Sequence, residues 1–312
     1  MATYIYRREA STGARDLAEA LGATRYRGRN YPLERKVRPG DVVIAWGERV
    51  PAIQDVHILN GAPILGKFED VVKLKAAGVR TIDVSRTQPM APPPGPPPVD
   101  PAIALFESLQ EQMEDFGNLF EAPRETLRTR PFQDGLAGIL TQITNLSATL
   151  RVPPPVATPV LAPDWLPRKN DHVGGLDLLT PPTTPDFWAK KENIVKEIRV
   201  HSFKGRSIRA GVKAPRDGFS KAQGNLHPWV RSWDGGWRMK YDGETARQRH
   251  RDIAHAAVAA LGLDFGAVDV AELADGTVMV LEVNRAPGLS DGTADVYATA
   301  IQRWMQENNI GR

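Results

Sequence analysis

The chain has 312 residues, enough for one large domain or for two to three small ones. Its apolar share of 41% suffices for a core, and no apolar run approaches the roughly 18 residues of a membrane helix. There are no cysteines, which excludes disulfides, thiolate metal sites and cysteine nucleophiles. Because the N-terminus MATYIYRREAST also lacks the apolar core of a secretory signal, we expect a cytoplasmic protein.

The first 86 residues alternate strand and helix patterns, which is typical of an α/β unit with a parallel sheet. No phosphate-binding glycine motif occurs in this stretch, so we assign residues 1–86 to an N-terminal α/β domain without a nucleotide site. We expect strands at residues 3–7, 41–46 and 79–84, a helix at 15–21 that ends at Gly22, and a helix at 68–77 that ends at Gly78.

Residues 88–101, QPMAPPPGPPPVDP, mark a boundary because such proline density excludes helix and sheet. A linker is the simpler interpretation, and a ligand for a proline-reading module is the alternative. Residues 102–120 and 135–150 have apolar residues near helical spacing. We therefore interpret residues 87–156 as a proline-rich linker with a helical insertion.

Positive charge is concentrated in residues 190–252, although the net charge is only +3. A basic surface attracts polyanions, and a triphosphate and a nucleic-acid backbone both qualify. For any single lysine here, an exposed position in solvent is the simpler interpretation. The basic residues include Lys190, Lys191, Lys196, Arg199, Lys204, Arg206, Arg209, Lys213, Arg216, Lys221, Arg231 and Arg238.

The C-terminal half mixes strand and helix patterns. Apolar positions on both sides of Lys204-Gly205 predict a hairpin. His201 lies on its first strand, and a single histidine at a strand position is more often structural or substrate-facing than catalytic. Helices are expected at about 244–261, ending at Gly262, and at 297–306.

Two apolar runs within residues 268–289, VDVAELADGTVMVLEVNRAPGL, are separated by Asp275-Gly276, which favours a two-residue hairpin turn. Such a turn pairs Ala274 with Thr277 and sets Asp269 opposite Glu282. Asn284 then shares the Glu282 face and lies diagonal to Asp269. Two carboxylates and an amide oxygen on one rigid face suit Mg²⁺, and an exposed acidic hairpin is the alternative.

The sequence LEVNRAPGL, preceded by LGLDFGAVDV, resembles the closing motif of the ATP-grasp ligases, whose metal ligands are an Asp and then a Glu-x-Asn. Carried over, the metal ligands are Asp269, Glu282 and Asn284. The resemblance covers most of residues 160–290 and residues 1–85 only loosely. It implies an α/β protein with the ATP-grasp fold, in which the N-terminal α/β domain precedes α+β catalytic lobes at residues 157–312.

The segment WLPRKNDHVGGLDLL (165–179) resembles the family's basic strand residue and glycine-rich loop over the triphosphate, although two glycines alone are typical of plain turns. Either Arg168 or Lys169 is then the basic residue, and Gly174-Gly175 is the flap. Residues 187–191 resemble the hinge that lines the adenine pocket. By this resemblance the further nucleotide-site residues are Lys190, Lys191 and Lys213, with Arg199 beside them; without it, an amphipathic hairpin with exposed cations is the simpler interpretation.

The segment GNLHPWVRSWDGGW (224–237) resembles an arginine-containing segment of ligases that extend peptides and proteins. Arg231 is the matching arginine, and its planar fork can hold a carboxylate and then the acyl phosphate formed from it. Arg231 and Arg199 are thus the catalytic residues that the resemblance implies. Trp233 stands where that family has Asn, and the three tryptophans at 229, 233 and 237 suit a core, a lid or a stacking surface.

The resemblance implies a carboxylate–amine ligase that uses ATP and Mg²⁺, or Mn²⁺ in its place, and forms an acyl phosphate from a small-molecule or peptide carboxylate before an amine attacks. Within this family, the sequence resembles the peptide- and protein-glutamate-ligase-like branch and the ATP-grasp proteins encoded by bacteriophages. Two alternatives remain: a protein that binds nucleic acid through residues 190–252, and an ATP-grasp relative that binds or hydrolyses ATP without ligation.

Overall fold

The computed structural model describes residues 1–7, 10–27, 32–89, 134, 137–138, 140–141, 164–168, 185–229, 231–241 and 246–310. Residues 1–88 and 164–312 form one compact unit, and residues 89–163 form another. The predicted insertion at 87–156 therefore lies almost wholly outside the described residues. In the described ranges, no helix combines the length and the apolar character of a membrane span.

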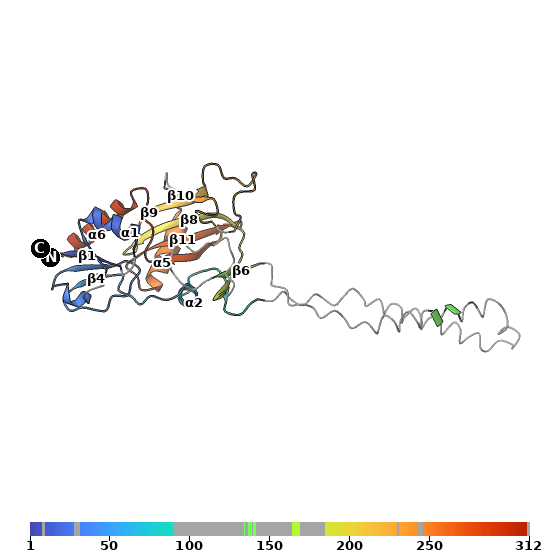
Figure 1. Ribbon diagram of the computed structural model, residues 1–312, viewed down its shortest axis with the longest axis horizontal. Coiled ribbons are helices and arrows are strands. Elements are labelled where there is room, and N and C mark those ends of the chain that lie inside the picture. The colour runs from blue at the N-terminus through green and yellow to red at the C-terminus, as the bar shows by residue number, and fades with distance from the viewer. Residues whose placement is uncertain are drawn as a thin grey trace. The chain divides into compact units, whose positions relative to one another are not determined.

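A parallel sheet of four strands, in the order β2-β1-β3-β4, opens the chain (Figure 1). The predicted strands at 3–7 and 41–46 and the first helix are confirmed. Helix α1 begins at Thr12, before the predicted start, because the Ser11 hydroxyl caps it by accepting a hydrogen bond from the Ala14 amide. The elements are β1 (Thr3–Tyr6), α1 (Thr12–Leu21), β2 (Thr24–Tyr26), the 3₁₀ helix η1 (Leu33–Arg35), β3 (Val42–Ala45) and β4 (His57–Leu59).

Helix α2 (Lys67–Ala76) follows, and the strand predicted at 79–84 is wrong for most of its length. Thr81 makes only an isolated bridge to Val280, and β5 is the short pair Val84–Ser85. β5 does not join the parallel sheet. It pairs with β7 (Phe187–Lys190), which pairs in turn with β6 (Trp165–Arg168), so that a small antiparallel sheet in the order β5-β7-β6 forms.

The largest sheet has five antiparallel strands in the order β10-β9-β8-β11-β12. The hairpin predicted around Lys204-Gly205 is confirmed, and both turn residues have positive φ, as a two-residue turn requires. The predicted helices at 244–261 and 297–306 are also confirmed, with shifted ends. The elements are β8 (Ile194–Phe203), β9 (Arg206–Pro215), β10 (Trp237–Lys240), α5 (Gln248–Ala260), β11 (Phe265–Leu273), β12 (Val278–Asn284) and α6 (Thr293–Glu307).

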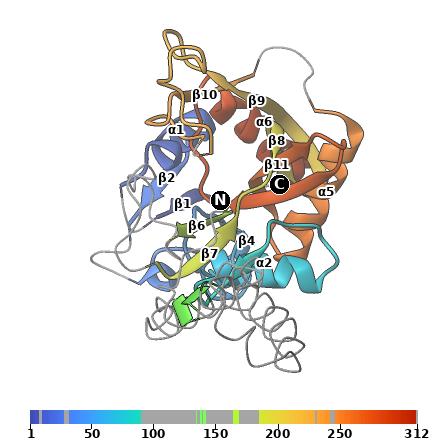
Figure 2. The ribbon, with the colours of Figure 1, turned by 90° about the vertical axis from the view of Figure 1, so that its right-hand side faces the viewer.

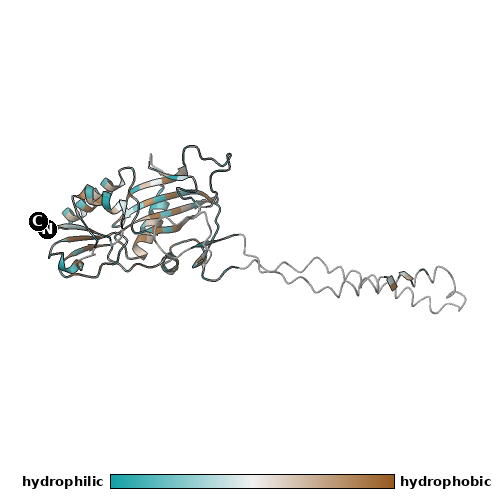
Figure 3. Ribbon diagram, in the orientation of Figure 1, coloured by the Kyte–Doolittle hydropathy of each residue, from teal (hydrophilic) through white to brown (hydrophobic). Residues whose placement is uncertain are grey.

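The two faces of the five-stranded sheet differ because side chains alternate along each strand. Figure 3 shows hydrophobic and hydrophilic residues interspersed along these strands. One face is apolar and packs against α5, with Val200, Val268 and Val283 among its buried residues. The opposite face carries Glu197, Arg199 and Asp269, and it is the face on which the candidate site is built.

A shared core joins the parallel sheet to the ends of the larger sheet. Trp46, directly after β3, lies 5.4 Å from the Phe265 ring and 6.0 Å from the Tyr297 ring, measured between centroids. Helices α1 and α6 pack against each other over this core (Figures 1 and 2). The segment that follows β12 is thereby held against the N-terminal sheet.

A buried ion pair fixes α2 to the end of β12. The Arg285 guanidinium donates to Asp70 Oδ1 at 2.5 Å and to the Pro63 carbonyl at 2.7 Å. Both side chains of the pair are about 95% buried, with relative exposures of 5% and 6%. A buried charge needs its partner, so this contact constrains how α2 meets the strand that carries Glu282 and Asn284.

We expect Arg285→Met to destabilise the fold by about 3–5 kcal/mol, because it leaves the Asp70 carboxylate buried without its cation. The free energy of unfolding, from urea titration, measures the effect. Arg15→Met on the exposed side of α1 is the control and should change stability by no more than about 1 kcal/mol. The double variant Arg285→Met with Asp70→Asn should recover part of the loss. Wild-type stability in the single variant would contradict the anchoring role.

Candidate active site

The charged face of the five-stranded sheet is ordered in rows that cross the strands. The central row joins the two predicted metal carboxylates to Arg199, and the neighbouring rows carry Asn284 and Glu197. The rows are Glu282-Asp269-Arg199-Gly211, Asn284-Ala267-His201-Arg209, and Met279-Ala271-Glu197. The predicted opposition of Asp269 and Glu282 is therefore confirmed, and so is the position of Asn284 on the same face.

The turn that leads to this pairing differs from the prediction. Leu273 donates its amide to the Thr277 carbonyl, so the loop has three residues, and the predicted Ala274–Thr277 pair is wrong. Gly276, with φ of 80°, ends the loop in the left-handed conformation typical of three-residue hairpins. Val270 pairs with Val280, but the next residue, Asp269, pairs with Glu282, so Leu281 is an extra residue on β12. This bulge restores the predicted pairing of Asp269 with Glu282.

Asp269 is held by Arg199 through two parallel hydrogen bonds. Arg199 Nε lies 2.7 Å from Oδ1, and its terminal nitrogen lies 2.8 Å from Oδ2. Burial opposes ionisation of Asp269, but the guanidinium outweighs it and lowers the pKa of the carboxyl. For Arg199, burial acts to lower the pKa, and Asp269 raises it by more. Both groups are therefore charged over the physiological pH range.

Glu282 contacts cations from other parts of the chain. Lys67, the first residue of α2, places Nζ 3.3 Å from Glu282 Oε1. Burial lowers the pKa of the Arg168 guanidinium on β6, while the carboxylates of Glu282 and Glu197 act in the opposite direction. Arg168 therefore shares the electrostatic environment of the sheet face. Lys67 thus contacts Glu282 from outside the sheet, and Arg168 lies within electrostatic range of the same carboxylate.

Glu197 joins the remaining predicted cations. Its Oε1 lies 2.9 Å from Lys213 Nζ, and its Oε2 lies 3.9 Å from Arg231 Nε. Arg231 also donates to the Ile194 carbonyl at 2.6 Å and lies over the Trp237 ring, 4.7 Å from the centroid. Burial raises the pKa of Glu197, and Lys213 opposes that shift. The two cations therefore favour the ionised carboxylate, against the effect of burial.

His201 is fully buried one row away from Asp269. Its Nδ1 lies 3.2 Å from the Tyr297 hydroxyl and its Nε2 lies 3.0 Å from the Tyr241 hydroxyl. Burial, aided by the positive charge of Arg199, lowers the pKa of His201 to about 3. The imidazole is therefore neutral at physiological pH and acts as a hydrogen-bonding group. This agrees with the structural interpretation of His201 from the sequence.

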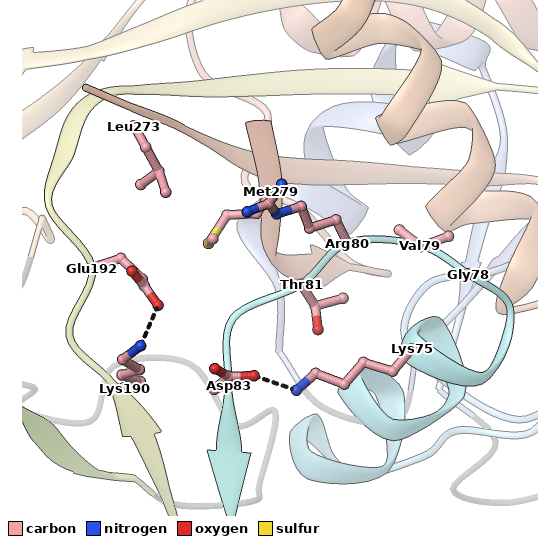
Figure 4. A pocket seen from close by; sticks show the side chains of 10 residues that line it. All are labelled: Lys75, Gly78, Val79, Arg80, Thr81, Asp83, Lys190, Glu192, Leu273 and Met279. Atoms are coloured by element: carbon pink, nitrogen blue, oxygen red, sulfur yellow. Dashed lines mark hydrogen bonds and ion pairs between the residues drawn. The ribbon is translucent and has the colours of Figure 1, made fainter. Parts of the chain in front are cut away.

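A cavity of about 460 Å³ opens where β7 passes into β8 (Figure 4). Met279 and Leu273 form its apolar side, and Met279 lies on the same sheet face as Asp269. Lys190, the last residue of β7, and Glu192, in the connection to β8, face the cavity. Lys190 Nζ lies 3.8 Å from Glu192 Oε1. Its lining is Lys75, Gly78, Val79, Arg80, Thr81, Asp83, Lys190, Glu192, Leu273 and Met279.

The oxygen donors of the charged face fit a hard divalent cation. Asp269, Glu282 and Asn284 supply two carboxylates and one amide oxygen on a rigid hairpin, and Mg²⁺ uses one or two carboxylates together with waters and substrate phosphates. Each carboxylate retains lone pairs after accepting its present hydrogen bonds. In the described part of the chain, this face included, no group of three or more His, Asp or Glu side chains is arranged for a metal, so the candidate set consists of two carboxylates and one amide.

Most of the predicted site residues meet on this face. Arg168, Arg199, Lys213, Arg231, Asp269, Glu282 and Asn284 lie on or beside it, and Lys190 lines the cavity. Lys191 lies farther out, with Nζ 5.7 Å from the centroid of the Trp229 ring. Lys169, Gly174 and Gly175 lie outside the described residues.

Two contributors, Lys67 and Glu197, are absent from the predicted set. Lys67 carries a signal in the sequence: a cation in the first turn of a helix opposes the helix dipole, so its place there calls for another reason. Glu197 precedes Arg199 by two residues on the same strand, and strand alternation puts both side chains on one face.

Along the chain, a parallel sheet is followed by a small and then a larger antiparallel sheet, and carboxylates and cations gather on the larger one. This arrangement is the ATP-grasp fold. The chain is similar to the D-alanine–D-alanine ligase from Bacillus anthracis, with 12% identity, a TM-score of 0.50 and 99% of both chains covered. It is also similar to the ATP-grasp ligase PsnB complexed with a minimal precursor, Mg and ADP, with 9% identity, a TM-score of 0.50 and 97% and 98% covered. Searches of protein-family models and of curated proteins gave no match.

The burial of His201 predicts a pH-dependent stability. Because its pKa is about 3 in the folded chain and about 6.5 when unfolded, the unfolded state binds an extra proton between these values. The stability contributed by the neutral imidazole is present above pH 6.5. It is lost as the pH falls towards 3, by up to about 1.4 kcal/mol per pH unit.

We expect the free energy of unfolding to depend less steeply on pH in His201→Gln, since glutamine does not titrate. Between about pH 4 and 6.5 the slope should fall by up to about 1.4 kcal/mol per pH unit, which corresponds to one proton. Urea titrations of both proteins at several pH values measure the two slopes. The offset between the proteins at pH 8 gives the packing cost of the substitution separately. Equal slopes in the two proteins would show that His201 does not bind its proton differently on unfolding.

Proposed function

We propose that the protein is an ATP- and Mg²⁺-dependent carboxylate–amine ligase that works through an acyl phosphate. The observation that carries this proposal is the register that sets Asp269 opposite Glu282, beside Arg199, on the buried face of the larger sheet. Opposed carboxylates repel each other unless cations lie between or beside them. A metal–nucleotide complex accounts for this arrangement better than an exposed acidic hairpin does.

The nucleotide is assigned to the space between the hinge and the charged face. The purine enters the cavity at Lys190 and Met279, and Lys191 belongs to the hinge beside it. The phosphates lie towards Lys67 and Lys213, which form ion pairs with Glu282 and Glu197, and towards Arg168, which lies within electrostatic range of both carboxylates. Lys169 and the Gly174-Gly175 flap complete the phosphate site. Residues 157–312 then supply the catalytic lobes, and residues 1–86 supply Lys67.

Asp269, Glu282 and Asn284 hold Mg²⁺, for which Mn²⁺ can substitute because it takes the same oxygen ligands. When bound, the metal would neutralise negative charge that develops on the phosphates during transfer. Arg199 keeps Asp269 ionised and in one orientation, as its two hydrogen bonds require. The protein thus contributes position and countercharge rather than covalent chemistry.

The reaction has two transfers. A carboxylate oxygen of the acid attacks the γ-phosphorus of ATP, the bond to the β-phosphate oxygen breaks, and ADP leaves. The amine nitrogen then attacks the carbonyl carbon, the carbon–oxygen bond to phosphate breaks, and inorganic phosphate leaves while the amine proton passes to water. Arg231 holds the carboxylate and then the acyl phosphate with its planar fork. A small-molecule or peptide acid is the expected substrate, and the similar ligase PsnB is complexed with a minimal precursor.

Nucleic-acid binding through residues 190–252 is the second candidate. Trp233 is 65% exposed, and Arg216 lies over its ring at 4.2 Å from the centroid, which is a stacking arrangement. However, several cations of this stretch are committed to carboxylates, including Arg199 to Asp269, Lys213 to Glu197 and Arg249 to Glu272. These pairs weaken the case for a phosphate-backbone surface. ATP turnover without ligation is the third candidate.

An isotope experiment tests the ligase directly. Amino acids and peptides are screened with ATP and Mg²⁺ for ADP release, and the acids that respond are prepared with ¹⁸O in the carboxylate. An acyl phosphate transfers one carboxylate oxygen to inorganic phosphate, so labelled phosphate and an amide product are expected. ADP release with unlabelled phosphate and no product would instead indicate ATP hydrolysis alone.

We expect Asp269→Asn and Glu282→Gln to lower MgATP turnover by about 10²-fold or more while the fold persists, because each removes a charged ligand from a hard cation. Asp275→Asn, in the turn of the same hairpin, is the matched control: it removes a carboxylate but keeps the oxygen that accepts from the Thr277 amide. Steady-state ADP release and circular dichroism measure activity and folding. Wild-type turnover in either site variant would refute the metal assignment.

Arg231→Lys separates the ligase from the nucleic-acid binder. Lysine keeps the charge but loses the bidentate fork, so we expect product formation to fall by about 10²-fold with a smaller effect on ATP affinity. Arg238→Lys on β10, whose arginine pairs with the exposed Asp217, is the control and should stay near wild type. If Arg231 only contacts a nucleic-acid backbone, lysine should substitute well, and salt-dependent DNA binding should persist in both variants. Normal ligation by Arg231→Lys would remove the catalytic role.

A further inference from the structure

A chain of hydrogen bonds runs through the buried His201 from helix α6 to the end of β10. The imidazole lies between two phenols, with Nδ1 3.2 Å from the Tyr297 hydroxyl and Nε2 3.0 Å from the Tyr241 hydroxyl. The side chain of Thr293 also lies near Tyr241 and acts to lower the pKa of its hydroxyl. Thr293 donates its own hydroxyl to the Ser290 carbonyl at 2.6 Å.

The neutral form of His201 sets the roles of its two ring nitrogens. A neutral imidazole carries one N–H, so one nitrogen donates to one phenol and the other accepts from the second phenol. Either tautomer satisfies both bonds.

The Tyr241 ring occupies the end of the central charged row. That row ends in Gly211 on β9, and a Cβ at this position would lie 2.6 Å from the Tyr241 ring, so only glycine leaves room for it. The Arg209 guanidinium covers the ring at 4.2 Å from its centroid. Burial raises the pKa of the Tyr241 hydroxyl, and the charge of Arg199 acts in the opposite direction, which is expected of close neighbours.

We propose that Tyr241 is a positioning residue for Arg199, and that the hydrogen-bond chain through His201 holds it in place. Asp269 restrains the guanidinium on one side. On the other side Gly211 contributes no side chain, and the Tyr241 ring lies in its place beside Arg199. The consequence for catalysis rests on the proposed function, but the restraint on Arg199 does not.

Two phenol deletions on the same imidazole test the proposal. Tyr241→Phe removes the bond on the Arg199 side, and Tyr297→Phe removes the bond on the core side while leaving the bond between His201 Nε2 and the Tyr241 hydroxyl. The Nε–H resonance of Arg199, assigned with Arg199→Lys, reports the guanidinium in the full-length protein. We expect a shifted resonance with faster solvent exchange in Tyr241→Phe and an unchanged resonance in Tyr297→Phe. An unchanged resonance in Tyr241→Phe, or equal changes in both variants, overturns the proposal.

Turnover of MgATP, measured as ADP release, gives the second readout. We expect Tyr241→Phe to lower kcat by about 10-fold with KM for ATP changed by less than about 3-fold, and Tyr297→Phe to stay within about 2-fold of wild type in kcat. His201→Gln, whose amide can donate to Tyr241, should retain more activity than His201→Leu. Equal losses of kcat in both phenol variants would indicate a packing effect and contradict the proposal. If wild type releases no ADP while the Arg199 resonance responds as expected, the proposed function fails and the positioning role stands.

Discussion

Neutralisation of charge on one buried face of the five-stranded sheet constrains the rest of the structure. Strand alternation gives this sheet an apolar face against α5, and it leaves Glu197, Asp269 and Glu282 together on the other. Carboxylates in such a place are costly unless cations pair with them. The cations come from distant parts of the chain, including Lys67 on α2 and Arg168 on β6, so the folded site depends on several elements being placed together.

The same ion pairs are a poor means of stabilisation and a good means of positioning. Desolvation offsets much of the attraction in a buried pair, and apolar residues of similar volume often serve stability as well. What a bidentate pair such as Arg199–Asp269 supplies is a fixed orientation of both groups. The Arg285–Asp70 pair acts similarly between elements, because it fixes the end of β12 against α2. Rigid support of this kind is what a site for transferring a charged group requires.

The sequence predicts the site better than it predicts the path of the chain. The opposition of Asp269 and Glu282 follows from the hairpin pattern, yet it is reached through a three-residue loop and an extra residue at Leu281. These two departures cancel, and periodicity alone contains neither of them. The segment at 79–84 has a strand-like pattern, but its neighbours are the edge of β12 and the hinge, so it makes only a single bridge there. The position of Lys67 in the first turn of a helix marks it as unusual, but its partner lies more than two hundred residues away, and no local pattern identifies that partner.

The irregularity at Leu281 also explains how one hairpin serves two parts of the site. Met279 and Glu282 are three residues apart, so in a regular strand they would lie on opposite faces. The extra residue between them changes the parity, and both pair with residues of the charged face, Met279 with Ala271 and Glu282 with Asp269. The apolar wall of the cavity and the Glu282 carboxylate are thereby set side by side on one rigid element. In the proposed function, this fixes the distance between the purine site and the metal site.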